Sequence, residues 1–369
     1  MLSQTEKQTD TTKTHIVYFD VLRVIAILAV ITLHVAAAHF SDTGVFSFTW
    51  EMSNMWNGLM RWGVPVFVMI SGALFLDPAR EIGFRKLYSK NIFHVGGVLL
   101  FWSVAYAVLG FVTGASKGSI EKLAAHVVLG HYHLWFLYML LGLYIIVPLL
   151  RPICKEKTLL RYFLVLSLFF SFLLGAVVKI GTGLNLLMPH AVFTKGLQVL
   201  RILMEQRIFF HFTLGYVAYF VLGYYIHQLT LSAAQRKVIY LLGILSGIFS
   251  VLFTRLVSQS AGARFDFYSG GNVTLPVLFE ALAVFVFVKY HAAALPEKGI
   301  SVFAYLSKRV LGIYLVHAAV QGCLSKLGLS SAGFNALISI PLIALLVFCL
   351  SWIGTEVIRK IPWLGSRIT

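Results

Sequence analysis

A succession of apolar runs, each close to the roughly 20 residues that cross a bilayer, limits what this chain can fold into. The runs cover about 16–38, 54–76, 92–113, 129–150, 159–180, 207–228, 238–257, 273–290, 300–323 and 334–357. A chain in lipid must satisfy its backbone hydrogen bonds internally, which leaves a bundle of helices as the simplest solution. We therefore expect an all-α, polytopic membrane helix bundle with about ten transmembrane helices.

The charged residues agree with a membrane protein and give its orientation. Only 12% of residues are charged, whereas a soluble domain has about 25%. The net charge of +16 comes from basic residues that lie mostly between the apolar runs. One set of loops, with both termini, holds roughly twice as many Lys and Arg as the other and is expected to be cytoplasmic. The same distribution argues against nucleic-acid binding.

The chain contains no internal repeat and no segment with the composition of a soluble domain. Residues 1–14 are polar, and we expect a disordered cytoplasmic tail there. Residues 15–369 are expected to form a single integral membrane domain. The cysteines, Cys154, Cys323 and Cys349, are far apart and form no CxxC pair, so we expect no metal site.

The first apolar run carries two ionisable residues, Arg23 and His34, eleven positions apart. Eleven residues of helix return to within about 20° of the same face and rise roughly 16 Å. Ionisable groups inside a span usually face a cavity or a partner. Asp20 precedes Arg23 by one turn and could hold its guanidinium. The alternative is an arginine that snorkels to the headgroups and a histidine at the interface.

Further imidazoles fall toward the same outer half of the membrane. The fourth run opens with His131 and His133, and the ninth carries Tyr314 and His317 on one face. A converging set of histidines suits proton transfer near neutral pH. His39 and His211 are also on this side, and we expect them to be plain interfacial residues.

Several cations are expected on the cytoplasmic side. Lys308 and Arg309 lie inside the predicted ninth span, and Arg85 and Lys86 lie in a loop. Basic groups suit a phosphate-bearing ligand, although the positive-inside rule alone also explains the loop residues. Glu280 is a carboxylate deep in a span, and it could pair with Arg61 or with Arg309.

Five segments, in order, resemble the acyltransferase-3 family of bacterial membrane O-acyltransferases. They are YFDVLRVIAILAVITLH, RWGVPVFVMISGALFL, HLWFLYMLLGLYIIVPLL, LGIYLVH and IPWLG. The resemblance covers nearly the whole chain. It is nearest to the stand-alone branch, which is similar to enzymes that O-acetylate surface polysaccharides such as enterobacterial common antigen.

The resemblance implies a function and a set of site residues. The family moves an acetyl group from cytoplasmic acetyl-CoA, a co-substrate rather than a bound cofactor, to an envelope glycan or lipid-linked sugar across the bacterial cytoplasmic membrane. It implies essential roles for Arg23 and His34. We expect His34 as general base, His317, His133 and Tyr314 as its helpers, and the cationic residues as coenzyme anchors: Arg23, Lys308, Arg309, Arg85 and Lys86.

Several points stay open beside this interpretation. The family's Arg-x-x-Arg before the third span is replaced here by Arg85, Lys86 and Lys90, which keep the charge but change the spacing. The same buried charges would suit a proton-coupled transporter or exporter of a lipid-like or glycan-like substrate. A succinyl group could also take the place of the acetyl group. Whether the acyl group moves directly or through a covalent intermediate is equally open.

Overall fold

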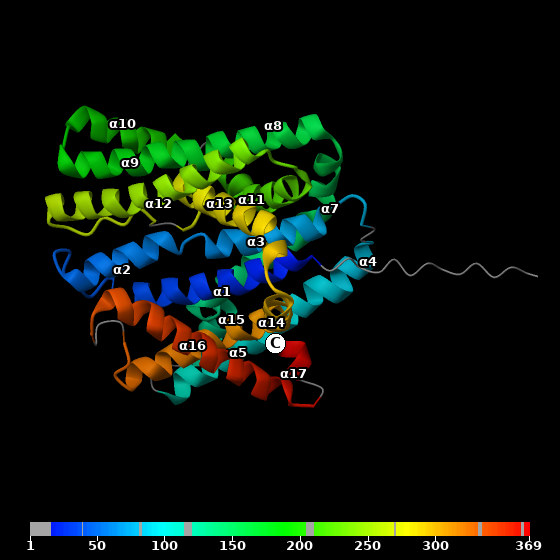
Figure 1. The fold of residues 1–369 in the computed structure, drawn as a ribbon. Coiled ribbons are helices and arrows are strands. Elements are labelled where there is room, and N and C mark those ends of the chain that lie inside the picture. The colour runs from blue at the N-terminus through cyan, green and yellow to red at the C-terminus, as the bar shows by residue number, and fades with distance from the viewer. Residues whose placement is uncertain are drawn as a thin grey trace, which may run out of the picture.

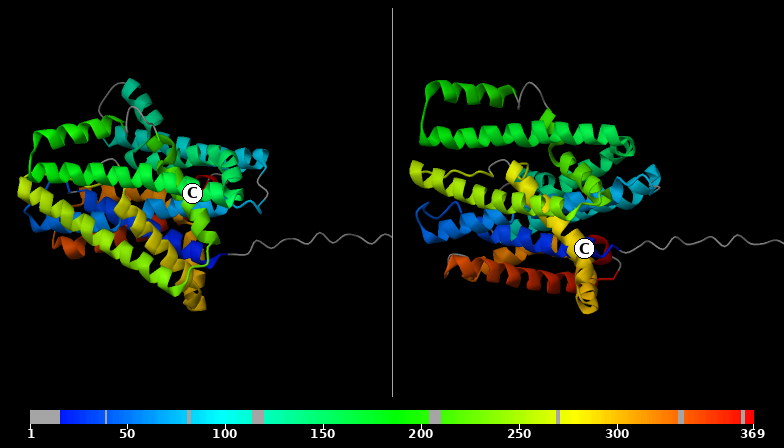
Figure 2. Two further views of the ribbon diagram at one scale, coloured as in Figure 1. Left: turned by 90° about the horizontal axis from the view of Figure 1, so that it is seen from above. Right: turned by 45° about the horizontal axis from the view of Figure 1, so that its top comes forward.

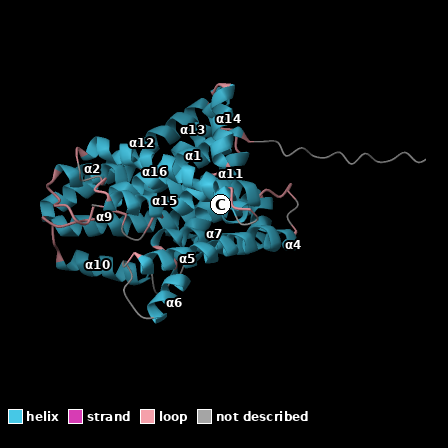
Figure 3. Ribbon diagram, turned by 90° about the horizontal axis from the view of Figure 1, so that it is seen from below, coloured by secondary structure: helices cyan, strands magenta, loops and turns pink. Residues whose placement is uncertain are grey.

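The structure is a computed structural model that describes residues 16–38, 40–80, 83–113, 120–203, 210–268, 271–330, 334–362 and 365–369. The predicted disordered tail, 1–14, lies outside these ranges, as does His39. The described residues form helices joined by loops (Figure 3). The polytopic all-helical bundle is confirmed.

The helices of the first half begin and end as follows: α1 Val17–Ala37, α2 Phe48–Leu59, α3 Gly63–Phe75, α4 Phe84–Lys86, α5 Phe93–Val112, α6 Ile120–Leu129, α7 Trp135–Lys155, α8 Lys157–Ser167 and α9 Leu174–Leu187. Those of the second half are α10 Ala191–Ile202, α11 Phe210–Gln228, α12 Ala233–Ala261, α13 Leu275–His291, α14 Glu297–Ser307, α15 Val310–Lys326, α16 Ala336–Arg359 and α17 Gly365–Ile368. Short π turns at Leu87–Ile92 and Leu168–Leu173 make α4–α5 and α8–α9 continuous, and 3-10 turns occupy Tyr132–Leu134 and Ala292–Ala294.

Eight helical stretches of the described chain are long and apolar enough to cross a membrane, and the bent pair α14 and α15 makes a ninth. The predicted span 207–228 corresponds to α11, which is preceded by residues outside the description. Figure 1 and the two views in Figure 2 show the long helices running side by side. We call the end at which α1 begins the basic end, because Arg85, Lys86, Arg151 and Arg236 lie there, and the other end the histidine end.

Helix α1 is the centre of the bundle. In its most apolar stretch 78% of residues are buried, against 22% for α12, whose Leu and Ile side chains face outward as lipid-facing residues do. Figure 1 shows α1 between a group that contains α3, α11 and α13 and a group that contains α14, α15 and α16. Its ionisable residues, Arg23 and His34, therefore lie among other helices rather than toward lipid.

Two glycines let α3 and α11 touch through their backbones. A Cβ added to Gly72 would lie 1.7 Å from the carbonyl oxygen of Phe220, and one added to Gly223 would lie 2.0 Å from that of Met69. Small residues at such crossings allow the close helix packing that stabilises bundles in lipid. The contact holds α3 and α11 in a fixed position relative to each other, on one side of α1.

Gly223→Ala is therefore expected to lower the free energy of unfolding by about 1–3 kcal/mol, the usual cost of overpacking. Gly142→Ala on α7 is the matched control, because a Cβ there meets nothing within 4 Å. It should be neutral or stabilising by up to about 1 kcal/mol, from helix propensity alone. Thermal melts of both variants in detergent measure the difference, and equal melting temperatures would contradict the close backbone contact.

The continuous ninth span predicted at 300–323 is wrong. Helices α14 and α15 meet at Lys308 and Arg309 with a bend of 66°. Arg309 Nε donates to Glu356 Oε1 at 2.6 Å, and its guanidinium lies 3.6 Å from the ring centroid of Tyr305. The Tyr305 hydroxyl donates to the same carboxylate oxygen at 2.8 Å. These contacts with α16 stabilise the bend near the basic end.

Candidate active site

Three segments bring four histidines together at the histidine end. His34 lies in the last turn of α1, His131 and His133 flank the start of the turn before α7, and His317 lies in the middle of α15. The ring centroids of His34 and His317 are 5.3 Å apart, those of His317 and His133 5.1 Å, and those of His133 and His131 5.0 Å. We call this set the histidine cluster.

His317 is fully buried, and its hydrogen bonding defines its tautomer. Its Nδ1 bonds to the backbone carbonyl of Tyr314. A carbonyl oxygen only accepts, so Nδ1 carries the hydrogen and Nε2 of the neutral ring keeps its lone pair. Nε2 has no hydrogen-bond partner among the described residues. The ring next to His34 thus offers a free basic nitrogen.

His133 contacts both His131 and Tyr314. It is 1% exposed, and its Nδ1 is 2.8 Å from Nδ1 of His131. Its backbone carbonyl accepts a hydrogen bond from the hydroxyl of Tyr314. The Tyr314 proton is therefore engaged in positioning the His133 turn. This contact makes Tyr314 a positioning residue in the geometry observed.

Arg23 lies near the basic end of the same helix as His34, and its predicted pairing with Asp20 is confirmed. Arg23 Nη1 is 3.2 Å from Asp20 Oδ1 and 3.3 Å from the hydroxyl of Ser307 on α14. The Asp20 side chain is largely buried, which makes the pair a fixed feature of the bundle interior. Ser307 was not singled out from the sequence, because only the fold brings it to Arg23.

A cavity of about 200 Å³ lies between Arg23 and Tyr314, and its described lining includes none of the four histidines. Arg23, Ser71 and Ser307 contribute its polar groups, and Tyr314 brings it to the histidine cluster. The remaining lining is apolar: Val30, Val64, Phe67, Phe136, Leu140, Val310 and Leu311.

The other predicted coenzyme anchors lie apart from this cavity. Arg85 and Lys86 are exposed on α4, and Lys308 is exposed at the bend between α14 and α15. Arg309 is engaged with Glu356, so its guanidinium is already paired. Of the predicted anchors, Arg23 is the one that lines the cavity toward the histidine cluster.

Arg61 and Glu280 form a second polar group inside the bundle. Arg61 Nε donates to Asn57 Oδ1 at 2.8 Å, and its guanidinium carbon lies 4.8 Å from the centroid of the Tyr268 ring. Glu280 is 6% exposed, and neither carboxylate oxygen has a hydrogen-bond partner among the described residues. Of its two predicted partners, Arg309 pairs with Glu356 and Arg61 donates to Asn57.

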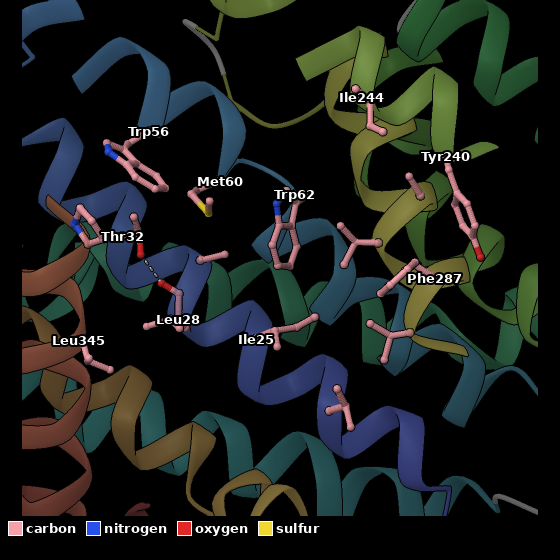
Figure 4. A pocket seen from close by; sticks show the side chains of 16 residues that line it. Ile25, Leu28, Thr32, Trp56, Met60, Trp62, Tyr240, Ile244, Phe287 and Leu345 are labelled. Atoms are coloured by element: carbon pink, nitrogen blue, oxygen red, sulfur yellow. Dashed lines mark hydrogen bonds between the residues drawn. The ribbon is translucent and has the colours of Figure 1, made fainter. Parts of the chain in front are cut away.

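A larger cavity of about 770 Å³ lies on the other face of α1, between α2, α12, α13 and α16. Figure 4 shows Ile25, Leu28, Trp56, Trp62 and Phe287 around it. Its lining contains no carboxylate, imidazole or cation. This cavity, which we call the apolar groove, suits a hydrocarbon chain of a membrane lipid and offers no group for proton transfer.

Within the described residues, no three His, Cys, Asp or Glu side chains are arranged to hold a metal ion. The histidine rings approach one another in tilted and edge-to-face arrangements. The cluster offers imidazole nitrogens and hydroxyl groups that can take part in proton transfer.

The described residues form a polytopic helix bundle in which a histidine cluster lies beside Tyr314, a lining residue of a small cavity. A model of the acyltransferase-3 family, described as an acyltransferase domain, matches residues 16–356. The chain belongs to this family and is a multi-pass membrane acyltransferase. Searches of curated proteins and of solved structures found no match.

Proposed function

We propose that the protein transfers an acetyl group from acetyl-CoA in the cytoplasm to a hydroxyl of a cell-envelope glycan on the outer side of the bacterial cytoplasmic membrane. The observation that carries the proposal is the cavity that leads from Arg23 to Tyr314 beside the histidine cluster. The positive-inside rule puts the basic end in the cytoplasm. Donor and acceptor then approach the same histidines from opposite ends.

In the proposed reaction His34 accepts the proton of the acceptor hydroxyl while the hydroxyl oxygen attacks the thioester carbonyl. The new ester C–O bond forms, the C–S bond breaks, and the proton passes from His34 to the leaving thiolate. A positioned base contributes about 10²–10⁴-fold to such a step. The free Nε2 of His317 is suited to hold the His34 ring in one tautomer.

The interior cavity favours direct transfer over a covalent acyl intermediate. Arg23 and His34 are on one face of α1, roughly 16 Å apart along the helix. An extended pantetheine arm in the cavity would carry the thioester toward the cluster while its phosphates stay near Arg23. No acyl carrier is then required between the two ends.

The same cavity favours an acetyl group over a succinyl group. Among the described residues that line it, Arg23 is the only charged one, and it lies at the basic end. A succinyl carboxylate near Tyr314 would be surrounded by Val30, Val64 and Phe136, and a buried charge without a partner is strongly unfavourable.

The test uses purified protein in lipid nanodiscs with acetyl-CoA labelled on its acetyl group and an envelope glycan extract. Wild type should release free thiol and transfer label to the glycan. Leu311→Trp should fill the cavity and reduce both signals at least tenfold, because it blocks the pantetheine path. Ile244→Trp is the matched control, since it places the same ring in the apolar groove.

A proton-coupled transporter is the competing function, and thioester consumption distinguishes the two. Label movement across the membrane without thiol release would favour the transporter. Equal turnover in Leu311→Trp and wild type, with both proteins folded by thermal melt, would contradict the cavity as the donor path.

A further inference from the structure

A separate pocket of about 310 Å³ opens at the histidine end between α5, α6 and α15. Its size is within the range of small-ligand sites, about 300–1,000 Å³. The groups that give the pocket its character are Tyr106, Thr113, His126, His131, Gly322 and Lys326. It shares no lining residue with the donor cavity.

The pocket has the chemistry of an anion site. Lys326 and His126 are exposed at its edge, and His131 lies partly buried within it. The described residues that line it include no aspartate or glutamate. An ammonium group beside imidazole N–H donors favours carboxylate or phosphate oxygens. The ring of Tyr106 stacks on His131 with centroids 4.4 Å apart, which gives the pocket a rigid aromatic wall.

The pocket is next to the reacting end of the site without being part of it. His131 bonds to His133 of the histidine cluster. Between the pocket and His34 lies Tyr132, whose ring centroid is 4.6 Å from that of His131 and 5.4 Å from that of His34. The rings of His131 and Tyr132 thus stand between a ligand in the pocket and His34.

We propose that this pocket binds an acidic sugar residue, such as a uronic acid, of the acceptor glycan. A neighbouring residue of the same glycan then extends past Tyr132 and presents its hydroxyl to His34. Binding of an acidic sugar in this pocket does not depend on the proposed function. Presentation of the neighbouring hydroxyl to His34 rests on the proposed function. It narrows the acceptor from any envelope glycan to one that carries a carboxylate beside the acylated sugar.

The experiment measures binding of two disaccharides that differ in one group, cellobiuronic acid and cellobiose, to the protein in nanodiscs. Wild type should bind the acidic disaccharide about tenfold or more tightly than the neutral one, as a charged hydrogen bond implies. Lys326→Gln should remove that preference, Lys326→Arg should keep it, and Lys195→Gln, an exposed cation on α10, should not change it.

Gly322→Trp provides a second variant, because a Cβ at Gly322 meets nothing within 4 Å and the ring would occupy the pocket without disturbing the helix packing. It should abolish acid-dependent binding. No preference of wild type for the acidic disaccharide, or a preference that survives Lys326→Gln, overturns the inference. Acid-dependent binding without acetyl-CoA turnover would instead remove the proposed function and leave the anion pocket standing.

Discussion

His34→Ala is expected to reduce the rate of acetyl transfer by about 10²–10⁴-fold, the contribution of a positioned general base. A sugar hydroxyl is almost wholly protonated at neutral pH, so the attack on the thioester depends on the imidazole. The loss should appear in kcat, because His34 acts on the reacting proton rather than on the coenzyme. Steady-state thiol release and label transfer in nanodiscs measure it.

The histidine cluster itself provides the comparison for this variant. His317→Ala should cost less than His34→Ala, because His317 acts through the orientation of the neighbouring ring. His190→Ala is the control, since His190 is exposed between α9 and α10. Wild-type kcat in His34→Ala would show that another imidazole is the base, with the free Nε2 of His317 as the next candidate.

The first span shows how much of the site local sequence can predict. Helical periodicity alone sets Asp20, Arg23 and His34 on neighbouring faces of one helix, and the Asp20–Arg23 contact is observed at 3.2 Å. The order of the spans predicts that His34, His133 and His317 lie at a similar depth in the membrane. The helix contacts that bring His317 within about 5 Å of both His34 and His133 depend on packing and are not encoded in any one segment.

The bend at Lys308 and Arg309 is where prediction from hydropathy failed. An average over about 20 residues does not detect a local break, and neither proline nor glycine marks the position. The stabilising partner is Glu356, which is far along the chain on α16. The Gly72 and Gly223 contact is equally invisible in sequence, because a glycine in a span gives no indication of which helix approaches it.

Arg23→Ala is expected to lower kcat/KM for acetyl-CoA by about 30-fold or more, since loss of one partner of a buried charged contact costs about 2–5 kcal/mol. The guanidinium lies at the basic end of the donor cavity, where coenzyme phosphates would approach it. Arg23→Lys should recover part of the loss, because it keeps the charge without the planar fork.

The donor substrate separates phosphate recognition from a structural role. S-acetylpantetheine carries the same thioester arm without the nucleotide phosphates, so wild type and Arg23→Ala should turn it over at similar kcat/KM. A loss of the same size with both donors would mean that Arg23 supports the cavity through Asp20 and Ser307 instead. Asp20→Asn is an independent test of these two roles of Arg23. It breaks the Asp20–Arg23 ion pair while leaving the Arg23 guanidinium free to bind the phosphates. A structural role predicts that Asp20→Asn impairs both donors equally, whereas phosphate recognition predicts that it spares both.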